Sequence, residues 1–156
     1  MILTLLLAQT LVQMPIVSPV EPVFPPADPA KLSLVLVQTV SETDPIPLCA
    51  QPNCTSMFLG RYKDAVTLAG PALPAEFTAR IEMGSPWNMP YRLALIVEQQ
   101  DGQEPLVRAR TGFNVRTGEG CFEGRETDPL NWRPTGERFH WQRRALCLTD
   151  PAFKPE

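Results

Sequence analysis

The clearest alternation of hydrophobic and polar positions lies in residues 76–83, which read EFTARIEM. Phe77, Ala79 and Ile81 stand at every second position, and polar side chains stand between them. Side chains along a strand point alternately to opposite faces of a sheet. The segment therefore predicts an antiparallel strand with one buried and one solvated face.

Four other segments also have the composition of strands. Residues 31–40 (KLSLVLVQTV) carry Leu and Val on both faces, which is typical of a central strand. Residues 56–70 read as a long strand, in which Gly60 predicts a bulge or a sharp bend. Residues 91–100 and 105–113 are separated by an Asp-Gly turn signal, so they predict a hairpin.

The C-terminal third has a weaker pattern. Residues 114–139 are polar and interrupted by Gly and Pro, which indicates loops or one short helix. Residues 139–148 (FHWQRRALCL) read as a final strand. Five or six strands with short turns predict an all-β protein with at most one short helix, folded as a small OB-like barrel.

The segments before the first strand differ from this domain. Residues 1–14 hold an apolar run and no charged side chain, which predicts a signal peptide, although no Lys or Arg precedes the run. A start site assigned too far downstream would account for that gap, and the alternative is a short hydrophobic tail. The run is too short for a stable membrane span, which needs about 20 apolar residues. Residues 15–30 are proline-rich and predict an extended spacer, which places the β domain at 31–150 and a tail at 151–156.

Composition narrows the class of protein. Hydrophobic residues make up 44% of the 156 positions and charged residues 20%, which is enough for a packed core. The formal net charge is −3. An acidic chain argues against general nucleic-acid binding, which requires a basic surface.

The cysteines form an even set, Cys49, Cys54, Cys121 and Cys147. In an exported chain an even set predicts two disulfides, and three pairings are open. We favour Cys49–Cys54, which closes a tight loop before the second strand, and Cys121–Cys147, which ties the C-terminal segment to the last strand. A zinc site is the alternative, with Cys49, Cys54 and two of Cys121, Cys147 and His140 as ligands. The absence of a second closely spaced pair argues against it, so no cofactor or metal is expected.

Catalytic patterns are weak. His140 is the only histidine, and by alternation it faces away from Phe139 and Trp141, which indicates a rim position. No Gly-x-Ser-x-Gly elbow and no glycine-rich phosphate loop occur. The alternative remains a small hydrolase or a metal-dependent enzyme that uses His140.

Two regions are candidates for recognition. Trp87, Met89 and Tyr91 are large side chains in a loop between prolines, where they would either contact a ligand or plug the end of the barrel. The second candidate is an arginine-rich face in the C-terminal third, with Trp132, Trp141 and Arg143 as its expected binding residues. This face suits stacking on anionic or sugar ligands, unless its charges only pair with nearby carboxylates. Its eight arginines are Arg108, Arg110, Arg116, Arg125, Arg133, Arg138, Arg143 and Arg144.

The layout of the chain also resembles a known group. The segments NCTSMFLGRYKDAVTLAG, EFTARIEMGSPWNMPYRLALIVE, CFEGRETDPLNWRP and a late LCL, over most of residues 49–148, are similar to small uncharacterised exported proteins of proteobacteria. The resemblance implies export and an OB-like β domain, and it supplies no catalytic residues.

Together these patterns predict a periplasmic or secreted, non-catalytic module that binds a protein, a peptide or a glycan. A structural or stress-related protein without a ligand is a further possibility.

Overall fold

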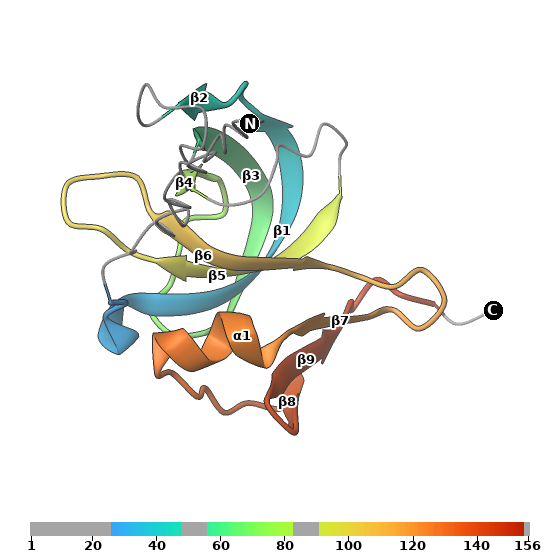
Figure 1. Cartoon of the computed structure of the whole chain (residues 1–156). Helices are drawn as coiled ribbons and strands as arrows, with labels where there is room; N and C mark the ends of the chain where they lie inside the picture. Colours follow the sequence, from blue (N-terminus) through green and yellow to red (C-terminus); the bar gives the residue numbers. More distant parts are fainter. Residues whose placement is uncertain (1–25, 48–55, 83–90, 155–156) are drawn as a thin grey trace, which may run out of the picture.

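The computed structural model describes residues 26–47, 56–82 and 91–154. Its strands are β1 (Leu32–Glu42), β2 (Ile46–Pro47), β3 (Ser56–Ala69), β4 (Phe77–Ile81), β5 (Arg92–Glu98), β6 (Leu106–Gly112), β7 (Glu119–Phe122), β8 (Phe139–Gln142) and β9 (Ala145–Thr149). Its helices are η1 (Pro29–Lys31), α1 (Gly124–Thr127) and η2 (Asp128–Leu130). The protein is an all-β barrel with a smaller C-terminal unit on one side (Figure 1).

The barrel closes because β1 pairs with two strands, β5 and β3. The strand order runs β1-β5-β6-β4-β3 and returns to β1. The β4–β6 pair is parallel and the other pairs are antiparallel. A five-stranded Greek-key barrel of this kind is the OB architecture, so the expected fold is confirmed. The short strand β2 pairs with the beginning of β3.

The barrel interior is filled by alternate residues of its five strands. In β4 the predicted face is confirmed, because Phe77, Ala79 and Ile81 all pack inward. The buried residues of this core are Val35, Val37, Phe58, Tyr62, Ala79, Ile81, Leu93, Leu95, Val97 and Val107.

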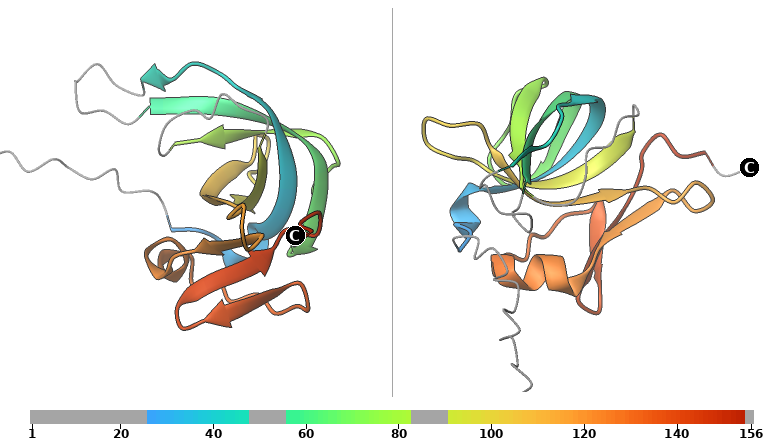
Figure 2. Two further views of the ribbon diagram at one scale, coloured as in Figure 1. Left: turned by 90° about the vertical axis from the view of Figure 1, so that its right-hand side faces the viewer. Right: turned by 45° about the horizontal axis from the view of Figure 1, so that its top comes forward.

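The C-terminal unit covers the outer face of β1, β5 and β6 (Figures 1 and 2). It consists of a three-stranded antiparallel sheet, in the order β7-β9-β8, together with α1 and η2. A second core lies between this unit and the barrel, which explains why β1 and β5 are apolar on both faces. Its buried residues are Leu32, Leu34, Leu36, Ala94, Ile96, Ala109, Phe122, Leu130, Phe139, Leu146 and Leu148.

Residues 139–148 form a hairpin, and the prediction of one continuous strand is wrong. Gln142 pairs with Ala145, which leaves Arg143 and Arg144 as the turn. Arg143 has φ 58°, a left-handed conformation that Gly or Asn adopts more readily. With arginines in the turn, no residue in this segment signals a chain reversal.

A bulge or a sharp bend was expected at Gly60, and the register of β3 with β1 shifts close to this residue. The ladder between β3 and β4 runs without a shift through Gly60, and its missing Cβ makes room for the ring of Tyr62. The β1–β3 register shifts between Thr39 and Ser41, opposite Tyr62 and Arg61, and it shifts again near Asp64, where φ is 53°.

Glu42, Tyr62 and Arg110 lie close together within the barrel and form what we term the interior polar cluster. A guanidinium nitrogen of Arg110 lies 2.9 Å from Oε1 of Glu42, and both side chains are almost completely buried. The guanidinium also lies over the ring of Phe58, 5.4 Å from its centroid. The charges are therefore held inside an otherwise apolar core.

Tyr62 makes the stability of the barrel sensitive to alkaline pH. Burial, followed by the nearby Glu42 carboxylate, raises the pKa of Tyr62 far above its ordinary value, and Arg110 only partly offsets this. The unfolded chain loses the phenol proton above about pH 10 while the folded chain keeps it, so the free energy of unfolding should fall as pH rises. Above about pH 10, the free energy of unfolding of the wild type should therefore fall more steeply with pH than that of the Tyr62→Phe variant. We expect the two slopes to differ by up to about 1.4 kcal/mol per pH unit. Urea unfolding between pH 8 and 11 measures the difference, and equal slopes for both proteins would contradict the prediction.

Candidate functional site

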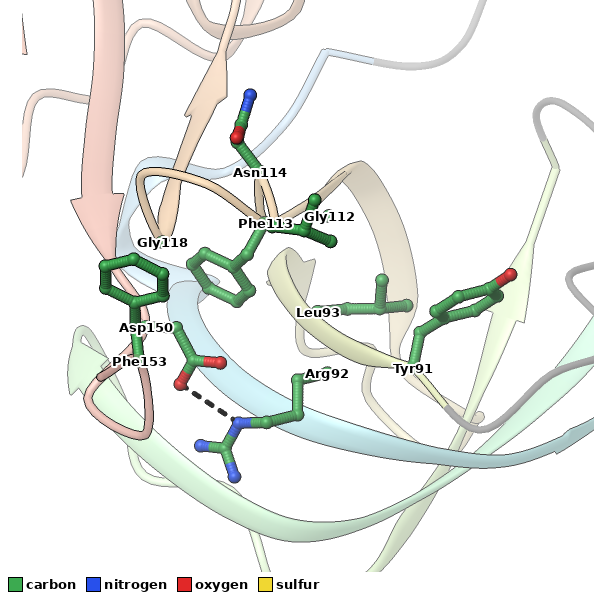
Figure 3. A pocket seen from close by; sticks show the side chains of 10 residues that line it. Tyr91, Arg92, Leu93, Gly112, Phe113, Asn114, Gly118, Asp150 and Phe153 are labelled. Carbon is green, nitrogen blue, oxygen red and sulfur yellow. Dashed lines mark ion pairs between the residues drawn. The ribbon is translucent and has the colours of Figure 1, made fainter. Parts of the chain in front are cut away.

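A groove of about 700 Å³, here called the Tyr91 groove, opens where the barrel meets the C-terminal unit. Figure 3 shows Phe113 and Phe153 near one end of it and Tyr91 at the other. Its lining is mostly apolar. The residues that line it are Tyr91, Arg92, Leu93, Gly112, Phe113, Asn114, Val115, Gly118, Asp150 and Phe153.

Barrel strands position one wall of the groove. Leu93 at the start of β5 pairs with Gly112 at the end of β6. The backbone N–H of Thr39 donates to the carbonyl oxygen of Tyr91 at 2.8 Å, which attaches this residue to β1. The backbone of Tyr91 is thus held beside the sheet, while the residue as a whole remains 44% exposed to solvent.

The loop after β6 supplies the second wall. The side-chain oxygen of Asn114 accepts hydrogen bonds from the backbone N–H groups of Arg116 and Thr117. The N–H of Gly118 donates to the carbonyl oxygen of Asn114 at 2.7 Å. These bonds fix the loop, and Val115 at its tip is 91% exposed.

The third wall comes from the residues after β9. The N–H of Asp150 donates to the carbonyl oxygen of Gly118, and the Asp150 carboxylate pairs with Arg92 at 3.1 Å (Figure 3). The ring of Phe153 lies so close to Gly118 that a Cβ there would be 2.2 Å from it. Because Gly118 also has φ 68°, glycine is required at this position both for the turn and for the contact. Phe153, in the expected tail, is therefore part of the groove.

The groove has the properties of a site for apolar groups. Its volume lies within the range of about 300–1,000 Å³ that is common for ligand sites. Arg92 and Asp150 neutralise each other, so no net charge selects a charged ligand. The described lining residues offer aromatic and aliphatic contact surface.

A second, more polar site, the Trp132 pocket, has a volume of about 380 Å³. The structure brings together Trp132 and Trp141, as the sequence analysis expected, with Arg133 and Asp128 beside them. The Arg133 guanidinium lies 4.7 Å from the ring centroid of Trp141, and Nε1 of Trp141 donates to the carbonyl oxygen of Pro134. Arg143 is exposed in the β8–β9 turn and does not line this pocket.

The arginine-rich face is smaller than the sequence indicated. Arg108 and Arg110 are buried in ion pairs with Glu98 and Glu42, so neither belongs to an exposed face. Three further arginines of this set are also paired with carboxylates. Arg125 pairs with Glu123, and both Arg133 and Arg144 pair with Asp128.

His140 lies at the edge of the C-terminal sheet, as a rim residue. Its Nε2 atom is 3.6 Å from Oε1 of Glu119. Within the described part of the chain, no hydroxyl group is hydrogen-bonded to the imidazole, as a hydrolase triad would require. Cys147 faces His140 across the sheet but is joined to Cys121 by a disulfide, which confirms that predicted pairing.

Some expected residues lie outside the described residues, namely Trp87, Met89, Cys49 and Cys54. Conversely, the sequence pattern did not indicate that Phe113, Val115 and Phe153 line the groove. Isolated apolar residues in polar segments were the available signal, but nothing in the sequence shows that positions 91, 115 and 153 converge.

Comparisons with protein-family models, with curated proteins and with solved structures found no match. Across residues 26–47, 56–82 and 91–154, no helix has both the length and the hydropathy needed to cross a membrane.

Proposed function

We propose that this protein is a non-catalytic, exported binding module that holds an apolar segment of a peptide or protein in the Tyr91 groove. The observation that carries the proposal is the exposed apolar lining of a groove whose walls are fixed by backbone hydrogen bonds. A site whose walls are already ordered loses little conformational entropy when a ligand binds. Exposed apolar side chains that gather in a concavity are typical of interaction sites.

Export is supported by the Cys121–Cys147 disulfide. Disulfides persist in the periplasm and outside the cell, whereas reducing systems keep most cytosolic thiols unpaired. The signal peptide at residues 1–14 remains a prediction from the sequence.

A peptide ligand fits the groove better than a glycan does. Sugars need polar partners beside an accessible aromatic face, and the groove lining is mainly apolar. The Trp132 pocket has the polar groups, but Arg133 already lies over the ring of Trp141, and Asp128 is engaged by Arg144. We therefore assign recognition to the groove.

A Val115→Asp variant provides the test. A peptide-display library selected on the wild-type protein should yield sequences with one or more large apolar residues. We expect Val115→Asp to weaken the best of these peptides by at least about tenfold, because it places a charge where apolar surface is buried, and tenfold corresponds to about 1.4 kcal/mol. Fluorescence anisotropy with a labelled peptide gives the dissociation constants.

Val66→Asp is the matched control, since Val66 is an exposed valine on β3 that does not line the groove. It should leave the affinity unchanged. A His140→Ala variant should also bind normally, because His140 lies outside the groove. Equal loss in both valine variants, or failure of the library to yield any binder, would contradict the proposal. Turnover of a substrate that is lost with His140→Ala would favour the hydrolase instead.

A further inference from the structure

The C-terminal sheet places four potential metal ligands on one of its faces. Cys121 of β7 lies directly opposite Cys147 of β9, and His140 of β8 lies opposite Cys147 on the other side. Residues directly opposite each other share a face of a sheet, and so do residues two apart on a strand. Glu119, two positions before Cys121, therefore belongs to the same face. We call these four residues the sheet donor cluster.

The distances within the cluster are short. One ligand atom each of Glu119, His140 and Cys147 lie within 4.8 Å of one another, and Nε2 of His140 is 3.6 Å from Oε1 of Glu119. Around a tetrahedral zinc ion, with bonds of about 2.0–2.3 Å, a nitrogen and an oxygen ligand are about 3.3 Å apart and two sulfurs about 3.7 Å. The carboxylate and imidazole are already within a few tenths of an ångström of that spacing.

In the oxidised protein the two sulfurs are bonded to each other, so they cannot serve as thiolate ligands. We propose that reduction of the Cys121–Cys147 disulfide converts the sheet donor cluster into a zinc site. A dithiol reductant supplies two electrons and two protons, which yields two Cys thiols and leaves the reductant as a disulfide. The thiols then release two protons as Zn²⁺ binds, giving two thiolate, one imidazole and one carboxylate ligand.

The chemistry of the four groups selects this class of metal. Thiolate and imidazole ligands favour Zn²⁺ over the hard cations Ca²⁺ and Mg²⁺, which take oxygen ligands. The Cys147 residue is buried, whereas the side chains of His140 and Glu119 are 58% and 39% exposed, which leaves an entry path from solvent. Among the described residues, His140 and Glu119 form ion pairs only with each other, so no Lys or Arg competes for the carboxylate.

The consequence is a protein with two exclusive states of one sheet, a disulfide-bonded state and a metal-bound reduced state. Both states join β7 to β9, one through a covalent bond and the other through coordination. The inference is independent of the Tyr91 groove, since none of the four residues lines it.

Cobalt titration of the reduced full-length chain tests the proposal. A Cys49→Ser/Cys54→Ser background leaves Cys121 and Cys147 as the only thiols, and the protein is reduced and handled without oxygen. Co²⁺ should bind at one equivalent with the visible bands of a tetrahedral site and the near-ultraviolet band of thiolate ligation, and Zn²⁺ should displace it. His140→Ala and Glu119→Gln should each weaken binding by at least about tenfold. Glu104→Gln, an exposed carboxylate elsewhere, is the control and should have no effect.

Other outcomes would overturn the proposal. Equal binding to the oxidised protein would place the metal elsewhere, and so would reduced-state binding that both His140→Ala and Glu119→Gln leave unchanged. Absence of the thiolate band would show that the sulfurs are not ligands. If reduction loosens the C-terminal unit, Zn²⁺ should restore the thermal transition seen by circular dichroism, because metal affinity stabilises the folded state. A reduced protein that Zn²⁺ neither binds nor restores would also refute the site.

Discussion

Replacing Arg110 with methionine is expected to lower the free energy of unfolding by about 3–5 kcal/mol, because the change removes the positive charge that lies 2.9 Å from the buried Glu42 carboxylate. Methionine keeps an apolar stem similar to that of arginine and removes the guanidinium that lies over Phe58, so the loss reports mainly on the charged group. Urea unfolding followed by tryptophan fluorescence measures the difference.

The matched control is Lys31→Met, which breaks the solvent-exposed ion pair with Asp101. An exposed pair contributes no more than about 1 kcal/mol, so this variant should stay close to the wild type. The Glu42→Gln/Arg110→Met double variant removes both charges of this pair, and it should be more stable than Arg110→Met alone. A loss below about 1 kcal/mol for Arg110→Met would show that Glu42 is not held in a dry interior.

Removal of the Cys121–Cys147 disulfide should have an effect of similar size. The bridge closes a loop of 26 residues, for which chain entropy alone gives about 3.5 kcal/mol. We expect Cys121→Ala/Cys147→Ala to lose about that much, measured by urea unfolding with a chelator present so that no metal contributes. Both side chains lie on the face of the sheet away from the second core, so the substitution opens no cavity there.

Chemical reduction provides a second route to the same quantity. In the Cys49→Ser/Cys54→Ser background, reduction without metal should destabilise the protein about as much as the double alanine variant does. If the alanine variant were as stable as the wild type, the disulfide would contribute nothing to the free energy of unfolding beyond what packing already provides.

This second prediction also bears on binding. The Tyr91 groove has one wall from the barrel and two that follow β6 and β9, joined through Asp150 and Gly118. Without the disulfide we expect the pairing of β7 with β9 to be weaker. Because Phe153 follows β9 in the chain, its side chain should then be held less firmly in the groove. Peptide affinity should then fall even though no groove residue has been changed.

Alternation of apolar and polar residues was enough to predict β4 and its buried face, whereas β1 was predicted from a run that is apolar on both faces. The Asp101-Gly102 turn and the β5–β6 hairpin were predictable for a similar local reason, since Gly102 takes φ 70°. The Cys121–Cys147 pairing was favoured because it ties the C-terminal segment to the last strand, and it is confirmed.

Arg110 shows where local pattern stops being informative. The β5–β6 register shifts at Arg108, which has no partner of its own in the ladder. Val107 faces the barrel interior, Ala109 the outer core, and Arg110 the interior again. One inserted residue thus moved an arginine from the expected binding face into a buried ion pair, and strand periodicity cannot reveal such a shift.

The groove and the sheet donor cluster depend still more on tertiary structure. Tyr91, Val115 and Phe153 are far apart in the chain. They line one groove because the C-terminal unit packs on β1, β5 and β6. His140 and Glu119 come close because their strands, β8 and β7, both pair with β9 and present these side chains on the same face of the sheet. The strand order depends on this pairing and cannot be read from the separation of the residues in the sequence. Local sequence specifies which residues form strands, whereas the order and register of those strands decide which side chains share a site.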